Sequence, residues 1–201
     1  MRILITSFGP FHDFSNNPSN IVMGRIESDF KLNLSPYHEI DYITLDVSYK
    51  KVDSFIRTMR KDYDLILHMG VAGNEKKMRF ETIARNQANS TDIEGVNKKN
   101  AKIIVKKDNI LTTNYPLFLI KQLKKKYFRY TKISKDAGTY LCNYIYFNSL
   151  SANNSRSDIL FLHIADFQNN EVATSLEKQV EIIQETINIF IKNSLAGSAR
   201  V

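Results

Sequence analysis

The chain has 201 residues, of which 43% are hydrophobic, and its formal net charge is +7. This length and composition predict a single domain over residues 1–201 with a substantial core, and they argue against a disordered chain. One cysteine excludes an internal disulfide, and the four scattered histidines form no His-Glu-x-x-His pattern, so we expect neither a metal nor another cofactor. A reducing, cytoplasmic setting fits this cysteine usage.

The first apolar stretch, Met1–Ser7, is far too short for a signal peptide or a membrane-spanning helix. We expect it to form the first strand, over Arg2–Ser7. The sequence Asn-Pro-Ser at 17–19 then predicts the start of a helix, capped by its Asn or its Ser. The residues expected on one face of this helix are Ile21, Val22, Ile26 and Phe30.

Strand-like and helix-like stretches alternate through most of the chain. The pattern predicts strands over Ile40–Val47, Tyr63–Met69, Lys77–Asn86, Lys102–Val105, Tyr130–Ile133 and Asp158–Ile164. It predicts helices over Tyr49–Arg60, Tyr115–Phe128, from Leu141 onward and over Thr174–Asn193, and it leaves Gln87–Asn100 irregular. Such alternation predicts an α/β fold, namely a three-layer α/β/α sandwich with a mostly parallel or mixed central sheet and sites at the carboxyl ends of the strands.

Positive charge is concentrated in one segment. Between Asn97 and Asp136, twelve Lys and Arg residues stand against two Asp residues, a surplus of +10, so the rest of the chain carries −3. The densest part, Lys121–Lys126, follows an apolar run, as the solvated face and basic end of an amphipathic helix would. No nucleic-acid motif accompanies it, and we expect the core to claim its aromatic residues, Tyr127, Phe128 and Tyr130. We therefore predict a solvated surface and no nucleic-acid partner.

The cysteine lies in Asp136–Asn143, directly before an apolar run. Gly138 permits a turn that most residues resist, Thr139 is a suitable N-cap, and a helix from Leu141 would place Cys142 in its first turn. The unpaired N–H groups and the dipole at that end of a helix favour an anion, so a thiolate nucleophile is one interpretation. A buried core thiol is the other, because free cysteine is among the most buried residue types.

Two further residues lie where a site at the strand ends would need them. His163 is close to the end of the predicted strand Asp158–Ile164, and Glu81 is a lone carboxylate within a strand-like stretch. A thiolate nucleophile needs a base and a group that orients the imidazole, and Cys142, His163 and Glu81 could fill these roles. Taken singly, the histidine could instead be a core residue with satisfied hydrogen bonds, and the glutamate a solvated one.

These segments together resemble the pyroglutamyl-peptidase I family of cysteine peptidases. One of them, Ala137–Asn143, is close to the family's nucleophile motif, Ala-Gly-Thr-Phe-Val-Cys-Asn. The resemblance covers most of the chain and keeps the family's order and spacing. The other stretches that carry it are Ile3–Phe11 followed by Asn17–Ser19, Gly70–Gly73 with Glu81 and Asn86 downstream, and Phe161–Ile164.

The resemblance implies roles for individual residues: Cys142 as nucleophile, His163 as general base and acid, and Glu81 as the group that orients the imidazole. It also implies an apolar slot for the pyrrolidone ring of the substrate, formed by Phe8, Phe11, Tyr140 and Leu141. The implied activity is removal of an N-terminal pyroglutamyl residue from peptides in the cytoplasm, with no cofactor, and the resemblance allows a homo-oligomer. Aromatic side chains suit a flat, uncharged lactam because it can stack on them.

The sequence also departs from the family pattern. Ser7 replaces a glycine of the opening turn, Asn74 replaces the second glycine of a Gly-Gly-Arg motif whose Arg is absent, and segment 87–95 is shortened and altered. Ala165–Phe167 replaces a Pro-rich stretch after the histidine. Two alternatives therefore stay open. One is a thiol amidase or acyl hydrolase with a different acyl substrate, and the other is a non-enzymatic homologue that binds an anionic partner through its basic segment.

Overall fold

The computed structural model describes residues 1–11, 15–30, 38–60, 62–73, 75–153, 156–169 and 173–198. Within these ranges, strands and helices alternate along most of the chain, as the sequence predicted. The strands are β1 (Arg2–Phe8), β2 (Glu39–Leu45), β3 (Leu65–Ala72), β4 (Met78–Glu81), β5 (Ile83–Arg85), β6 (Ala88–Thr91), β7 (Asn97–Ala101), β8 (Ile110–Thr112), β9 (Thr131–Ser134) and β10 (Asp158–Ala165). The helices are α1 (Pro18–Phe30), α2 (Tyr49–Thr58), α3 (Leu117–Lys126), α4 (Leu141–Ala152) and α5 (Leu176–Ser198).

Six strands form the central sheet, in the order β2-β1-β3-β10-β4-β9. Strands β2, β1, β3 and β10 run parallel, whereas β4 is antiparallel to β10 and parallel to β9. The prediction of a mostly parallel or mixed sheet is therefore confirmed. None of the described helices is both long enough and apolar enough to cross a membrane.

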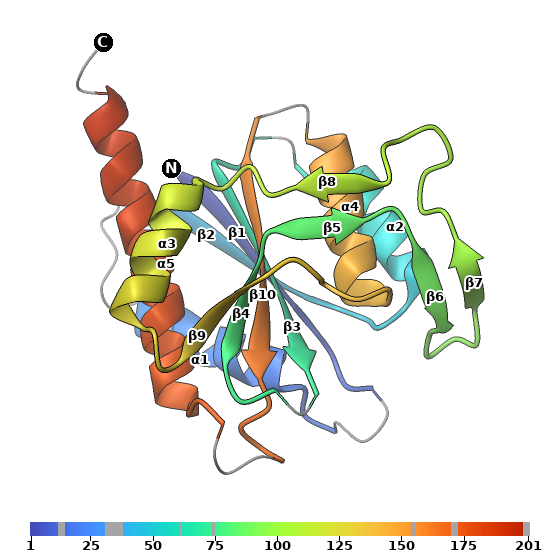
Figure 1. Ribbon diagram of the computed structural model, residues 1–201, viewed down its shortest axis with the longest axis horizontal. Coiled ribbons are helices and arrows are strands. Elements are labelled where there is room, and N and C mark those ends of the chain that lie inside the picture. The colour runs from blue at the N-terminus through green and yellow to red at the C-terminus, as the bar shows by residue number, and fades with distance from the viewer. Residues whose placement is uncertain are drawn as a thin grey trace.

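Helices cover both faces of this sheet, which confirms the three-layer sandwich (Figure 1). Helices α1, α3 and α5 pack on one face, and α2 and α4 pack on the other. Side chains alternate between the faces, as the pleat requires. In β1, for example, Ile3 and Ile5 point into the first core and Leu4 into the second. The parallel strands thus read as continuous apolar runs because both of their faces are buried.

Two small sheets, β5–β8 and β6–β7, lie on the α4 side of the molecule (Figure 1), and here three predictions were wrong. Lys77–Asn86 is two strands rather than one, because Thr82 turns the chain out of the central sheet by bonding through its N–H and its hydroxyl to the carbonyl of Ser134, at 2.8 Å each. Gln87–Asn100 is not irregular but includes β6 and part of β7, a largely exposed hairpin without an apolar alternation to reveal it. Lys102–Val105 forms turns rather than a strand.

The aromatic residues after α3 also differ from expectation. Tyr127 is buried, but Phe128 and Tyr130 are 56% and 38% exposed. Each exposed ring lies near a cation of the same chain: the Arg129 guanidinium is 5.6 Å from the centre of the Phe128 ring, and the Lys178 Nζ is 5.4 Å from that of Tyr130. The Tyr127 ring is therefore part of the core, whereas the rings of Phe128 and Tyr130 form cation–π contacts within the chain.

Candidate active site

The loop before α4 turns at Gly138, whose φ of +79° lies in the left-handed region. This confirms the predicted turn, since glycine adopts that region without a Cβ penalty. The predicted cap at Thr139 is wrong, because the N-cap is Tyr140 and it makes no side-chain capping bond. The carbonyl of Thr139 instead accepts a hydrogen bond from the N–H of Asn89 at 2.9 Å. Cys142 is consequently the second residue of α4, in its first turn as predicted.

The thiol of Cys142 lies against the backbone of β3. A Cβ built on Gly70 would be 2.6 Å from the Cys142 Sγ and 3.1 Å from an atom of the Phe161 ring, so a glycine is needed there for the thiol to occupy its place. Gly70 is also the register partner of His163 on β10. Cys142 is only partly buried and lines a pocket, so it is not an enclosed core thiol.

His163 and Glu81 face each other from neighbouring strands. The Nδ1 of His163 is 2.7 Å from the Oε1 of Glu81, the histidine is 6% exposed and the glutamate is fully buried. The interpretation of Glu81 as a solvated surface residue is therefore wrong. Because Nδ1 is engaged with the carboxylate, Nε2 is the ring nitrogen left to face the thiol.

The electrostatics of this pair favour a charged imidazole. Burial alone lowers the pKa of His163, but hydrogen bonds to Cys142 and Glu81, together with the negative charges of both, outweigh it and raise the pKa to about 9. The imidazolium is therefore the main form at neutral pH. A proton held on His163 next to a thiolate is the state in which a cysteine nucleophile is ready to attack.

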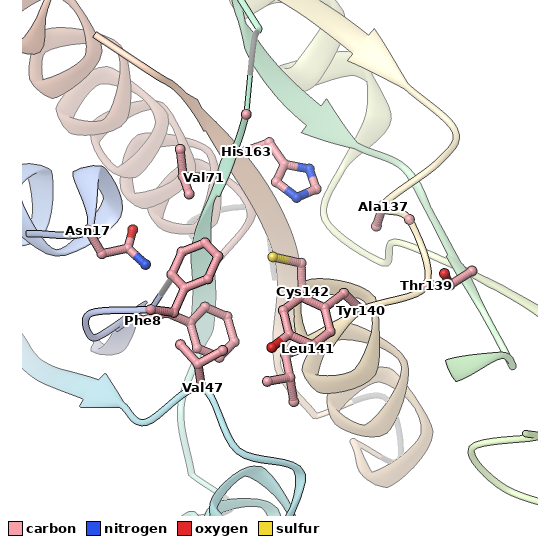
Figure 2. A pocket seen from close by; sticks show the side chains of 13 residues that line it. Phe8, Asn17, Val47, Val71, Ala137, Thr139, Tyr140, Leu141, Cys142 and His163 are labelled. Carbon is pink, nitrogen blue, oxygen red and sulfur yellow. The ribbon is translucent and has the colours of Figure 1, made fainter. Parts of the chain in front are cut away.

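A pocket of about 290 Å³ opens beside the thiol. In Figure 2, Phe8 and Val47 lie to the left of Cys142, and His163 lies above it. All four residues predicted for the substrate slot line the pocket. The full lining is Phe8, Phe11, Asn17, Val47, Val71, Gly73, Ala137, Gly138, Thr139, Tyr140, Leu141, Cys142 and His163. The sequence prediction missed Val47 and Val71 for this role, although Val47 follows β2 closely and Val71 lies near the end of β3, where strand-end sites are expected.

Two more residues of α4 hold the glutamate segment in place, and sequence reasoning did not single them out. The buried side chain of Asn143 accepts from the N–H of Arg85 and donates to the carbonyls of Arg85 and Gln87, at 2.8, 2.8 and 2.9 Å. The hydroxyl of Tyr146 donates to the backbone carbonyl of Glu81 at 2.9 Å. The helix that carries the thiol thus also fixes the strand that carries the carboxylate.

The described residues contain no group of three or more His, Cys, Asp or Glu side chains that could hold a metal ion. The chemistry available at this site is that of the thiol, the imidazole, the carboxylate and the N–H groups at the start of α4. This constellation can transfer an acyl group through a covalent thioester.

Comparisons with known proteins extend over nearly the whole chain. Residues 1–192 match the family model described as pyroglutamyl peptidase. The pyrrolidone-carboxylate peptidase of Thermosipho melanesiensis is 25% identical over 198 residues, which cover 89% of this chain and 88% of the relative. The pyrrolidone-carboxylate peptidase 1 of Saccharolobus solfataricus is 27% identical, with 96% and 95% covered.

Solved structures with a similar fold also cover nearly the whole chain. The pyrrolidone carboxyl peptidase of Fervidobacterium islandicum superimposes with a TM-score of 0.80 at 23% identity, covering 96% of this chain and 99% of that one. The enzyme of Pyrococcus furiosus gives a TM-score of 0.82 at 20% identity, with the same coverage. At these identities the likeness establishes a shared fold.

Proposed function

Because the chain belongs to the pyroglutamyl peptidase family, we propose that Cys142, His163 and Glu81 are the catalytic residues with which it removes an N-terminal pyroglutamyl residue from peptides. The observation that carries this assignment is the 2.7 Å contact between His163 and the buried Glu81, beside a thiol that opens to an apolar pocket. The enzyme is accordingly a cysteine exopeptidase.

Each residue has a defined step in this reaction. The Sγ of Cys142 attacks the carbonyl carbon of the pyroglutamyl group, and the resulting oxyanion is bound by N–H groups of the first turn of α4, including that of Cys142. His163 gives its proton to the leaving amine, which departs and leaves a thioester. The neutral His163 then takes a proton from water, whose oxygen attacks the thioester and releases pyroglutamate. Glu81 holds the imidazole in its orientation throughout.

The apolar slot explains why a lactam is preferred as the acyl group. Phe8, Phe11 and Tyr140 offer aromatic surface to a flat, uncharged ring, and Leu141 adds to the apolar wall. An N-terminal glutamine or glutamate carries an ammonium group, and its desolvation in such a slot costs several kcal/mol. We therefore expect a pyroglutamyl amide to be cleaved and the matching glutaminyl amide to be left intact. Equal cleavage of the two would favour a different acyl substrate.

A fluorogenic amide assay tests the activity directly. Wild type should release the fluorophore from a pyroglutamyl amide, and one equivalent of iodoacetamide should abolish the release by alkylating Cys142. The Cys142→Ala variant should fold with the same circular dichroism spectrum and lack activity. Turnover by this variant at the wild-type rate would disprove the assignment of the nucleophile.

Three broader expectations accompany the proposal. We expect the enzyme to act in the cytoplasm, where a free thiol stays reduced, and light scattering will show whether it is a homo-oligomer. We also expect the basic segment to bind no nucleic acid specifically, because the rings of Phe128 and Tyr130 lie near cations of the same chain rather than presenting bare stacking surfaces. Binding to single-stranded RNA should be weaker than about micromolar at physiological salt and should fade as salt rises.

A further inference from the structure

Two cations lie in line with the catalytic residues on the same face of the central sheet. The strand register places Gly70, His163, Arg79 and Lys132 side by side on β3, β10, β4 and β9. Side chains of residues paired across neighbouring strands point to the same face. Because neighbouring strands are about 4.8 Å apart, the backbone of Lys132 lies roughly 10 Å from that of His163.

These two cations share a single carboxylate. Glu75 forms an ion pair with the Arg79 guanidinium through its Oε1, and its Oε2 lies 2.7 Å from the Lys132 Nζ. Among the described residues, Glu75 is the carboxylate within ion-pair distance of these two cations, so the three ion-paired groups carry a net charge of +1, with Glu81 acting on Lys132 from further away. The Arg79 and Lys132 side chains are 22% and 44% exposed, so solvent and ligands reach them. The Arg79 Nε is buried and has no hydrogen-bond partner among the described residues, so the ion pair with Glu75 does not satisfy every donor of this guanidinium.

The chemistry of the reaction fixes where the leaving peptide begins. The acyl group occupies the slot beside Phe8, to the left of Cys142 in Figure 2, whereas His163 lies above the thiol. His163 protonates the leaving nitrogen, so this nitrogen must lie on the His163 side. The ribbons of β4 and β9 lie beyond His163, away from Phe8, as the strand order requires. Arg79 and Lys132 are the next residues beyond His163 in the strand register, so a peptide that continues in this direction runs over them.

We propose that Arg79 and Lys132 form a subsite for a carboxylate on the first or second residue after the scissile bond. This inference rests on the proposed function, because it assumes that the pyroglutamyl group fills the aromatic slot. An extended peptide advances about 3.4 Å per residue, so two residues span about 7 Å, which reaches the two side chains from His163. The carboxylate is either the C-terminus of a short peptide or the side chain of Asp or Glu, and the guanidinium fork suits both.

Two matched pairs of peptides test the subsite and distinguish the two sources of the carboxylate. The first pair is pyroglutamyl-Ala and pyroglutamyl-Ala-amide, which differ in a C-terminal charge. The second pair is pyroglutamyl-Ala-Glu-amide and pyroglutamyl-Ala-Gln-amide, which differ in a side-chain charge. In at least one pair we expect kcat/KM to be about fivefold higher for the charged peptide, which corresponds to about 1 kcal/mol, the upper end for a solvent-exposed ion pair. The preference should shrink at high ionic strength.

Charge variants of Lys132 test whether this residue contributes to the preference. In Lys132→Met the ratio should fall toward one, and in Lys132→Glu it should reverse. Lys125→Met is the matched control, since it removes the same charge from an exposed position on α3 and should leave the ratio as in wild type. A wild-type ratio near one in both pairs would overturn the proposal, and so would a preference that persists in Lys132→Met.

Calorimetry separates a failure of the subsite from a failure of the proposed function. We expect the Cys142→Ala variant to bind peptides without cleaving them, so that its affinities report binding alone. Charged peptides should bind about fivefold more tightly than their neutral partners, and equal affinities would count against the subsite. Absence of cleavage by wild type would disprove the proposed function. The affinities of the Cys142→Ala variant would still show whether the protein prefers a peptide with a carboxylate.

Discussion

Helix α4 presents a nucleophilic side chain to a buried histidine at each of its ends, and the two ends behave differently. Near its N-terminus, Cys142 is paired with His163 of β10, whose pKa the thiol helps to raise. About two turns further along, the Oγ of Ser149 lies 2.8 Å from the Nε2 of His68 on β3. The ring of Phe161 separates the two histidines, with centroid distances of 4.8 Å to His163 and 6.5 Å to His68.

The partners of each histidine decide its charge. His68 is fully buried between two hydroxyls, those of Ser149 and Thr6, and burial lowers its pKa to about 3, so it is neutral. His163 is almost as buried, yet its carboxylate and thiol partners raise its pKa to about 9. Burial by itself thus makes a histidine a neutral part of the core, and a charged partner makes it an acid–base group. Among the two, only the His163 end lines the pocket.

The substitution Cys142→Ser makes the two ends of α4 chemically alike, since each would then pair a serine with a histidine. We expect kcat/KM for a pyroglutamyl amide to fall at least about a thousandfold, because a hydroxyl is a far poorer nucleophile with this base. The melting temperature should change little, as the side chains are nearly equal in size. Activity close to wild type would show that the thiol is not the attacking group.

The substitution Glu81→Gln removes the charge that distinguishes His163 from His68. Glu81 raises the pKa of His163, so its loss should lower that pKa and move the alkaline limb of the kcat/KM profile, expected near pH 9 in wild type, to lower pH. We expect kcat to fall about 10²- to 10⁴-fold, because the imidazole loses its anionic partner. Glu177→Gln, an exposed change in the first turn of α5, is the control. An unmoved alkaline limb would contradict the role given to Glu81.

The substitution Gly70→Ala tests how closely the thiol must sit to His163. The new Cβ would lie 2.6 Å from the Cys142 Sγ, so the thiol must shift, and a displacement of about 1 Å costs about 100-fold in rate. Overpacking should also destabilise the fold by about 1–3 kcal/mol. Kinetics and chemical denaturation together measure both effects. Gly24→Ala is the control, since a Cβ at this position on α1 meets nothing within 4 Å.

How much of this could be read from the sequence differs between the two ends of α4. The order and spacing of the motifs predicted Cys142, His163 and Glu81 as site residues, and the structure places His163 and Glu81 in contact. The sequence did not predict the hydrogen bonds of His68, because its partners Thr6 and Ser149 are 62 and 81 positions away and belong to no motif. Pairings of this kind depend on the packing of a helix against a sheet, which no local pattern encodes.

The errors in the sequence predictions have the same origin. Thr139 fails to cap α4 because its carbonyl is engaged by Asn89, in the hairpin of β6 and β7. The strand predicted over Lys77–Asn86 breaks because Thr82 bonds to the carbonyl of Ser134, 52 positions later. In both places a long-range hydrogen bond overrides the local preference. The core strands were predictable because both of their faces are buried, which leaves a continuous apolar run in the sequence.

The substitution Ser149→Ala should have the smallest effect on activity, and it completes the comparison of the two ends. It removes one of the two hydroxyl partners of His68 and leaves a buried ring nitrogen unpaired, which costs about 1–3 kcal/mol of unfolding free energy. Because His68 is neutral and lies apart from the pocket, kcat/KM should change less than about twofold. Denaturant unfolding and the amide assay on the same preparation measure both quantities. A large loss of activity with unchanged stability would show that the His68 end of α4 takes part in catalysis, and the distinction between the two histidines would then be wrong.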